Sequence, residues 1–266
     1  MLKWLVTTDP SPDHNTACSR HDSHTGKWLS KSPEYQSWTT SKTRFLWLYG
    51  IPGAGKTVLL SSIIENVKSL CKALQSKDVA CVYYYCYFGR SQDETSPLLR
   101  WIIDQLIRRC QYVPNEILDC FHAGQQPSIS TLVVALSSLV KKFQKIYLFV
   151  DALDESLERQ NVLDLLLTLA GPGFDNISLL VMSREEIDIK IAIGSTAESI
   201  SLSNPYVDDD IRTYVRNQLK LHKKLSVLEP ALRTEIEDGL VQGAKGMYVS
   251  RYPLFYPCDC NLPFFT

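Results

Sequence analysis

The sequence lacks both a long apolar run and an excess of one charge. Its longest apolar stretches, at 45–51 and 146–150, are of strand length and fall short of the roughly 18 apolar residues that a membrane-spanning helix needs. The 28 lysines and arginines nearly balance the 29 aspartates and glutamates, whereas proteins that bind polyanions normally carry a basic excess or patch. We therefore expect neither a membrane nor a nucleic acid as a partner.

The sequence also lacks the marks of an exported protein. The apolar start at 1–6 gives way at once to polar residues at 7–9, so it is too short for a secretory signal. The eight cysteines include no CxxC pair and no compact framework, so we expect mostly reduced thiols. Both absences indicate a cytoplasmic protein. With 266 residues, 45% of them hydrophobic, the chain can bury the core of one large domain.

What the sequence does contain is an alternation of strand-like and helix-like segments. Apolar runs rich in β-branched and aromatic residues predict strands at 45–49, 79–88, 146–150 and 177–182, with a short one at 200–202. Helical spacing of apolar residues predicts helices at 56–74, 97–110, 117–121, 157–170, 207–221 and 230–242, and one that Ser130 caps and that ends near Phe143. This order implies crossover connections, a mostly parallel sheet and a three-layer α/β sandwich.

One glycine-rich turn follows the first predicted strand and matches the pattern G-x-x-x-x-G-K-[ST] at every required position. Its glycines let the backbone wrap closely and point N–H groups at phosphate oxygens, and the helix that opens at Lys56 adds the positive end of its dipole. Lys56 supplies a charge for the β- and γ-phosphates, and the Thr57 hydroxyl is a ligand for Mg²⁺. The residues that we expect to bind the phosphates of ATP or GTP are Gly50, Ile51, Pro52, Gly53, Ala54, Gly55, Lys56 and Thr57.

Acidic residues follow the strand at 146–150. Asp151 stands where that strand becomes a loop, so its carboxylate can meet the Mg²⁺ that Thr57 holds. Either Asp154 or Glu155 could orient or deprotonate an attacking water, and the spacing does not say which. Glu155 is the preferred candidate, because hydrolases that carry such a phosphate loop often have an acid at this position. The alternative is an ordinary solvated acidic loop.

The next strand ends in a polar pair, Ser183 and Arg184. Arg184 could reach the γ-phosphate, where it would sense its presence or stabilise charge during transfer. The alternative is an exposed arginine that merely ends a strand.

These three motifs, GIPGAGKT, LFVDALDE and LLVMSR, resemble those of the NACHT branch of the STAND P-loop NTPases. The similarity is strongest to the nephrocystin-type NACHT proteins that are common in filamentous fungi, often attached to ankyrin or WD repeats. The segments at 20–29 and 208–215 also resemble the family, and the likeness covers about residues 1–247.

The resemblance implies a slow switch driven by ATP or GTP, in which hydrolysis is coupled to opening and self-association. It implies that residues 50–57 bind phosphate, Asp151 binds Mg²⁺, Asp154 and Glu155 form the hydrolytic pair, and Arg184 is the sensor. It also implies that the lead-in near Thr25 and Gly26 lines the adenine side. The winged-helix, repeat and effector regions of such proteins are not recognisable here. We therefore expect a truncated form that contains the NTPase domain alone.

The expected organisation is a lead-in at 1–44, a P-loop NTPase core at 45–205, a helical extension at 206–248 and an atypical tail at 249–266. Within the lead-in, residues 9–13 are interpreted as a turn-rich loop. The tail shifts abruptly to proline, aromatics and cysteine, and Val249-Ser250 is what the splice-donor hexamer GTAAGT encodes. We therefore hypothesise that the tail is translated intron; the alternative is a genuine short tail on the surface.

A small kinase and a non-enzymatic module are the alternatives to the switch. A small P-loop kinase would usually carry an arginine-rich lid, and no compact arginine cluster is present beyond Arg108-Arg109. A non-enzymatic nucleotide-binding or interaction module is the other alternative, although the complete set of polar site residues argues against decay of the site. The spacing of His14, Cys18, His21 and His24 matches no standard structural zinc pattern, so we do not predict zinc there.

Overall fold

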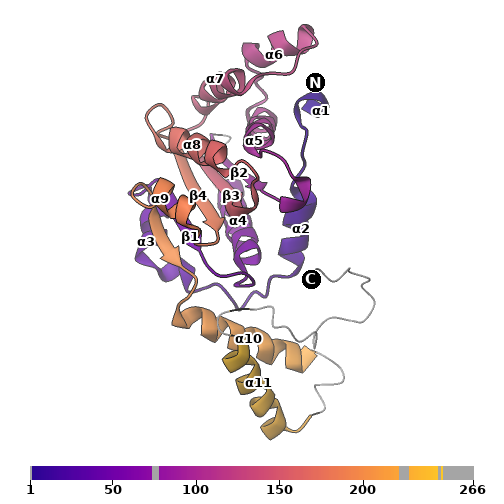
Figure 1. Cartoon of the computed structure of the whole chain (residues 1–266), viewed down its shortest axis with the longest axis vertical. Helices are drawn as coiled ribbons and strands as arrows, with labels where there is room; N and C mark the ends of the chain where they lie inside the picture. Colours follow the sequence, from indigo (N-terminus) through magenta and orange to yellow (C-terminus); the bar gives the residue numbers. More distant parts are fainter. Residues whose placement is uncertain (1, 74–77, 222–227, 245–246, 248–266) are drawn as a thin grey trace.

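The computed structural model describes residues 2–73, 78–221, 228–244 and 247. The tail at 249–266, and with it the hypothesis of a translated intron, lies outside the described residues. Strands and helices alternate along the described chain (Figure 1).

Within the described residues, five parallel strands form one sheet in the order β2-β3-β4-β1-β5. The strands are β1 Phe45–Tyr49, β2 Val79–Tyr85, β3 Lys145–Asp151, β4 Ile177–Ser183 and β5 Glu198–Ser201. β4 is buried along its whole length because β3 and β1 flank it and helices cover it, which explains why residues 179–182 are all apolar. The predicted α/β fold with a mostly parallel sheet is confirmed.

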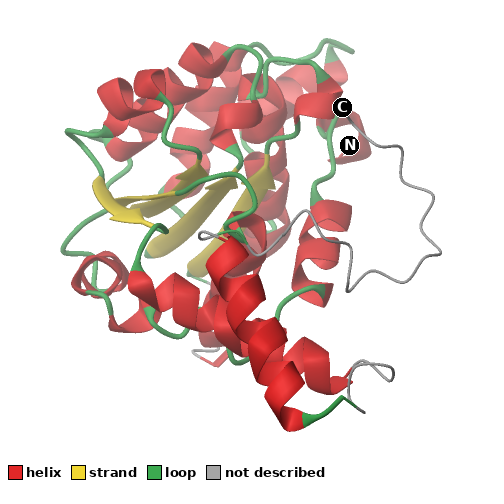
Figure 2. Cartoon of the chain, turned by 60° about the horizontal axis from the view of Figure 1, so that its bottom comes forward, coloured by secondary structure: helices red, strands yellow, loops and turns green. Residues whose placement is uncertain are grey.

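Helices cover both faces of the sheet, so the sandwich has three layers (Figure 2). The core helices are α4 Lys56–Ala73, α5 Thr95–Cys110, α6 Asn115–His122, α7 Ile129–Val140, α8 Arg159–Ala170 and α9 Ile187–Ile193. Alternate residues of β4 point to opposite faces. Leu179 and Val181 join the cluster with α5, α7 and α8, and Leu180 and Met182 join the cluster with α4.

The lead-in is folded onto the sandwich. It contains α1 Leu2–Leu5, α2 Ser11–Ser19, the short 3-10 helix η1 Leu29–Lys31 and α3 Pro33–Thr39. Trp38 is fully buried, and its Nε1 donates to the carbonyl of Leu179 in β4 at 2.9 Å. The interpretation of residues 9–13 as a turn-rich loop is partly wrong. Helix α2 begins at Ser11, because Pro12 lies in its first turn, where a missing N–H costs nothing.

The structure corrects the predicted end of β2, the predicted cap of α7 and the predicted start of α8. β2 ends at Tyr85 and not at residue 88, because the Arg90 guanidinium donates to the Tyr85 carbonyl at 2.8 Å and the chain turns into the 3-10 helix η2 Phe88–Arg90. Ser128 and not Ser130 caps α7, accepting from the N–H of Thr131 at 3.1 Å. Helix α8 begins at Arg159, two residues later than predicted.

The last described elements, α10 Pro205–Leu221 and α11 Pro230–Ala244, pack on each other at the foot of the molecule in Figure 1. Glu237 of α11 accepts from Arg212 and Arg216 of α10, which ties the two helices together. Among the described residues, no helix combines the length and apolarity needed to cross a membrane.

Candidate functional site

The three motifs meet at one edge of the sheet. Since the strands are parallel, the carboxyl ends of β1, β3 and β4 lie at the same edge, and a cavity of about 980 Å³ opens there. Its walls include the loop and helix start at 52–57, together with Asp151, Asp154, Glu155 and Arg184. The structure therefore brings the predicted polar site residues to one cavity. Gly50 and Ile51, the first two of the predicted phosphate-binding residues, lie outside this lining, which begins at Pro52.

The phosphate loop joins β1 to α4 and depends on its glycines. Gly53 and Gly55 have φ angles of +77° and +75°, a region that glycine enters without steric cost. The Lys56 ammonium donates to the carbonyls of Gly50 and Ile51 at 2.9 and 3.0 Å. Burial lowers the pKa of Lys56, and the charges of Asp154 and Asp151 oppose that shift. The lysine is thus held over the loop and faces both acids.

Asp151 ends β3 and is only 1% exposed. Neither of its carboxylate oxygens has a hydrogen-bond partner of standard geometry among the described residues. Burial raises its pKa to about 6, and the Thr57 hydroxyl and the Ala152 N–H, which lie outside that geometry, offset the rise only in part. A buried carboxylate that lacks a well-aligned hydrogen bond from the described residues and faces a threonine hydroxyl is a donor set that fits a hard cation such as Mg²⁺.

Asp154 and Arg184 are paired with each other. The N–H of Arg184 donates to Asp154 Oδ1 at 2.9 Å, and its Nε lies 3.0 Å from Oδ2. The pair joins the 3-10 helix η3 Leu153–Glu155 to the end of β4. Because both oxygens of Asp154 face Arg184, the acid is suited to fix the arginine and poorly placed to take a proton from water.

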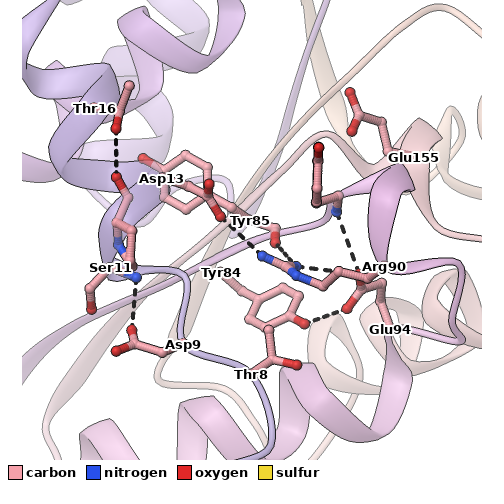
Figure 3. Close-up of polar contacts among 12 residues, drawn as sticks. Thr8, Asp9, Ser11, Asp13, Thr16, Tyr84, Tyr85, Arg90, Glu94 and Glu155 are labelled. Atoms are coloured by element: carbon pink, nitrogen blue, oxygen red, sulfur yellow. Dashed lines mark hydrogen bonds and ion pairs between the residues drawn. The ribbon is translucent and has the colours of Figure 1, made fainter. Parts of the chain in front are cut away.

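Glu155 is held differently. Its Oε2 accepts from the backbone N–H of Phe88 at 3.1 Å, and Phe88 begins the turn after β2. Arg90 anchors that turn by reaching both Asp13 and the buried Glu94 (Figure 3). Of the two acids that the spacing left open, Glu155 is thus the one that is not paired with Arg184.

The lead-in and α10 form the far wall of the cavity. The N–H of Gly26 donates to Asp210 at 2.6 Å, Asn217 donates to Asp22 at 2.9 Å, and Trp28 stacks on Tyr206. These bonds join segments that are nearly 200 residues apart, and no local pattern in the sequence predicts them.

His21 also lies in this wall of the cavity. Its Nε2 is buried and has no hydrogen-bond partner in the described part of the chain.

The fold and the phosphate loop define a P-loop NTPase-like domain, related to the NACHT and STAND proteins. Residues 24–184 match the family described as nephrocystin 3, N-terminal, which is more than half of the chain. The chain belongs to this family.

A curated relative gives a distant sequence match. The vegetative incompatibility protein HET-E-1 of Podospora anserina is 23% identical over 237 residues, which cover 84% of this chain and 17% of that protein. The chain thus spans only about a sixth of the length of this relative.

Solved structures share the fold at low identity. A Walker-type ATPase of Pyrococcus abyssi aligns with a TM-score of 0.53 and 12% identity over 83% of this chain and 64% of its own. The ORC1 protein of Aeropyrum pernix, solved in complex with DNA, gives 0.52 and 14% over 90% and 59%. The ORC2 protein of the same organism, in ADPNP–ADP complexes, gives 0.50 and 16% over 81% and 56%. At these identities the likeness concerns the fold alone.

Proposed function

We propose that this chain binds ATP or GTP together with Mg²⁺ in the cavity at the sheet edge and hydrolyses the nucleotide slowly, as the switch domain of a NACHT-type protein. The proposal rests on the surroundings of Asp151. Its buried carboxylate has no hydrogen-bond partner of standard geometry among the described residues, and it faces Thr57 at the end of a complete phosphate loop. A buried charge of this kind is costly unless the site has a cation to hold.

The loop residues have separate tasks in this proposal. The backbone N–H groups of 50–57 and the start of α4 hold the phosphates, and Lys56 leaves its two carbonyl partners to contact the β- and γ-phosphates. Thr57 and Asp151 would hold Mg²⁺, which neutralises phosphate charge when it is bound. These tasks require little movement, because residues 52–57 and Asp151 already line the cavity.

Hydrolysis would use the residues beyond the loop. Glu155 orients a water and accepts its proton. Asp154 acts as a positioning residue that aims Arg184 at the γ-phosphate, where the guanidinium stabilises charge during transfer. The ion pair that fixes Arg184 and the separate bond that holds Glu155 support this division of roles.

The base would lie against the lead-in and α10. Residues 19–26 and Trp28 line this side, with Val207 and Ile211 of α10. The partnerless Nε2 of His21 offers a hydrogen bond to an edge of the base. On this view the lead-in at 1–44 contributes to the nucleotide site, while 45–205 forms the core and 206–248 the helical extension.

The test is binding of labelled ATP and GTP to the purified chain with and without Mg²⁺. Wild type should bind saturably and with Mg²⁺ dependence, and Lys56→Ala should abolish binding because the phosphates lose their charge partner. Lys72→Ala, a change at an exposed lysine near the end of the same helix, should bind as wild type does. A folded wild type that binds neither nucleotide would refute the proposal.

The switch further implies self-association. We propose that the nucleotide-bound chain forms homo-oligomers, as the NACHT resemblance implies. Sedimentation of wild type with a non-hydrolysable nucleotide should show a larger species than sedimentation with the diphosphate. A single monomeric species under both conditions would separate nucleotide binding from assembly.

A further inference from the structure

Outside the nucleotide cavity, three side chains with metal-binding atoms converge between α2 and α4. His14 and Cys18 are four residues apart on α2, so they share one face of that helix. Glu65 faces them from α4, and the ligand atoms of all three lie within 4.8 Å of one another. His21 and His24, which stand near them in the sequence, are not part of this group.

The distances match a small tetrahedral metal site. Ligand atoms about 2.0–2.3 Å from zinc lie roughly 3.3–3.6 Å from one another in a tetrahedron. Here the Cys18 sulfur lies 3.6 Å from His14 Nε2, and Glu65 Oε1 lies 2.9 Å from the same nitrogen. Among the three ligands, the carboxylate lies too close to the histidine and would have to move, and the Glu65 side chain is half exposed.

The histidine is already oriented for ligation. His14 is 3% exposed, and its ring packs on Tyr83 with the centroids 4.5 Å apart. Its Nδ1 lies 2.9 Å from the Tyr85 hydroxyl, which leaves Nε2 directed at Cys18 and Glu65. Metal-binding histidines commonly have a hydrogen-bond partner at the second ring nitrogen, which fixes the ring.

The group already holds one cation. The Lys68 ammonium lies 3.1 Å from His14 Nε2 and 2.8 Å from Glu65 Oε1. An ammonium offers donors only, so in the tautomer whose Nε2 carries no proton these contacts use the same lone pairs that a metal would take. Lys68 is 28% exposed, so its flexible chain can leave toward solvent and admit an ion by the same path.

We propose that His14, Cys18 and Glu65 form a site for Zn²⁺ or a similar borderline transition metal, with water as the fourth ligand and Lys68 as the cation that the metal displaces. Imidazole and thiolate ligands select metals of this class over Mg²⁺ or Ca²⁺. The Cys18 thiol gives its proton to solvent as it ligates.

A metal bound by these residues would crosslink α2 to α4. Cys18 is followed directly by Ser19, the first residue of the lead-in segment that lines the nucleotide cavity. An ion bound here would fix the position of that segment relative to the helix that carries Lys56. The site lies apart from the phosphate loop, so its existence does not depend on the proposed nucleotide chemistry.

The test uses the full chain and Zn²⁺ alone, in competition with a chromophoric chelator. Wild type should bind one equivalent, and His14→Ala and Cys18→Ser should bind at least about tenfold more weakly. Two controls should keep wild-type affinity: Cys120→Ser on α6, and a double change of Cys258 and Cys260, which lie outside the described residues. Substitution by Co²⁺ should give a thiolate charge-transfer band that Cys18→Ser abolishes.

A second pair of variants keeps the test sharp if the ligand variants fold poorly. Lys68→Met should bind Zn²⁺ more tightly than wild type because the competing ammonium is gone, while Lys72→Met one turn further along α4 should not. Zinc binding that survives Cys18→Ser, that is lost in the Cys258/Cys260 variant, or that ignores Lys68→Met would overturn the proposal.

Discussion

Asp151 is a residue whose burial opposes its own ionisation. Its pKa in the fold is about 6, against an ordinary value of 3.8, and the gap corresponds to about 3 kcal/mol. Between pH 4 and pH 6 the unfolded chain has released this proton while the folded chain keeps it. The contribution of Asp151 to the free energy of unfolding therefore falls as the pH rises through this window and stays low above it.

Because the ionised Asp151 lowers the free energy of unfolding above pH 6, replacing it with a neutral residue in Asp151→Asn should stabilise the fold there. In the absence of nucleotide, the variant should be more stable than wild type at pH 7 by up to about 3 kcal/mol, and the gain should shrink toward pH 4. It should also lose Mg²⁺-dependent nucleotide binding, because the cation loses its carboxylate ligand. Urea unfolding at the two pH values measures the first effect. A variant less stable than wild type at pH 7 would show that the carboxylate is well satisfied in the fold.

Glu155 is predicted to act on the chemical step and not on binding. Glu155→Gln should lower the turnover number by about 10²–10⁴-fold, the usual effect of removing a general base, and leave nucleotide affinity close to that of wild type. Single-turnover hydrolysis together with equilibrium binding separates the two quantities.

The control for this prediction is Glu158→Gln, a change at an exposed glutamate just before α8, which should behave as wild type. Unchanged turnover in Glu155→Gln would favour a module that binds nucleotide without hydrolysing it. Product analysis with candidate acceptors would reveal a kinase.

At the scale of elements, the lead-in depends on one crowded glycine. Gly26 has a φ of +77°, and a Cβ there would lie 2.8 Å from Leu59 Cδ1. Leu59 lines the nucleotide cavity, as does Gly26 itself. Substitution would strain the backbone and displace the Leu59 side chain, which lines the site.

Gly26→Ala should therefore weaken nucleotide binding roughly tenfold, which is about 1.4 kcal/mol. The matched control is Gly173→Ala, at a φ of +89° with no atom within 4 Å of the added Cβ. Both variants should lose about 1–2 kcal/mol of stability from backbone strain, but Gly173→Ala should keep wild-type affinity. Equal affinity in the two variants would argue that the lead-in does not contribute to the site. Thermal unfolding and nucleotide titration supply both readouts.

Elements with a strong local pattern could be predicted from the sequence, and those fixed by distant contacts could not. β1 and the middle of β3 are continuous apolar runs, and β4 is apolar except at Ser178 and Ser183. These patterns are sufficient to place the three strands. Helix α2 has no clear apolar stripe, and it is held by burial of His14 and Ala17. The end of β2 is set by the Arg90 side chain, which lies only five residues beyond Tyr85 but belongs to no hydrophobic pattern. The spacing of apolar residues carries no signal for such polar contacts.

In the whole molecule, part of the site could likewise be predicted from the sequence and part could not. The parallel sheet brings Lys56, Asp151 and Arg184 together because their strands end at one edge, and this placement follows from the predicted fold. The closing wall does not follow from it. The bonds from Gly26 to Asp210 and from Asp22 to Asn217 span 184 and 195 residues, so only the folded chain shows that the lead-in and α10 meet.

Amide hydrogen exchange with and without Mg²⁺ and a non-hydrolysable nucleotide reports on the whole proposed site at once. We propose that one cavity holds the nucleotide between the phosphate loop, the acidic turn and the lead-in. Bound nucleotide should slow exchange in residues 50–57, 151–155 and 19–26 together, and Lys56→Ala should abolish all three effects. Binding that leaves these segments unprotected, or that protects the loop without the lead-in, would contradict the account.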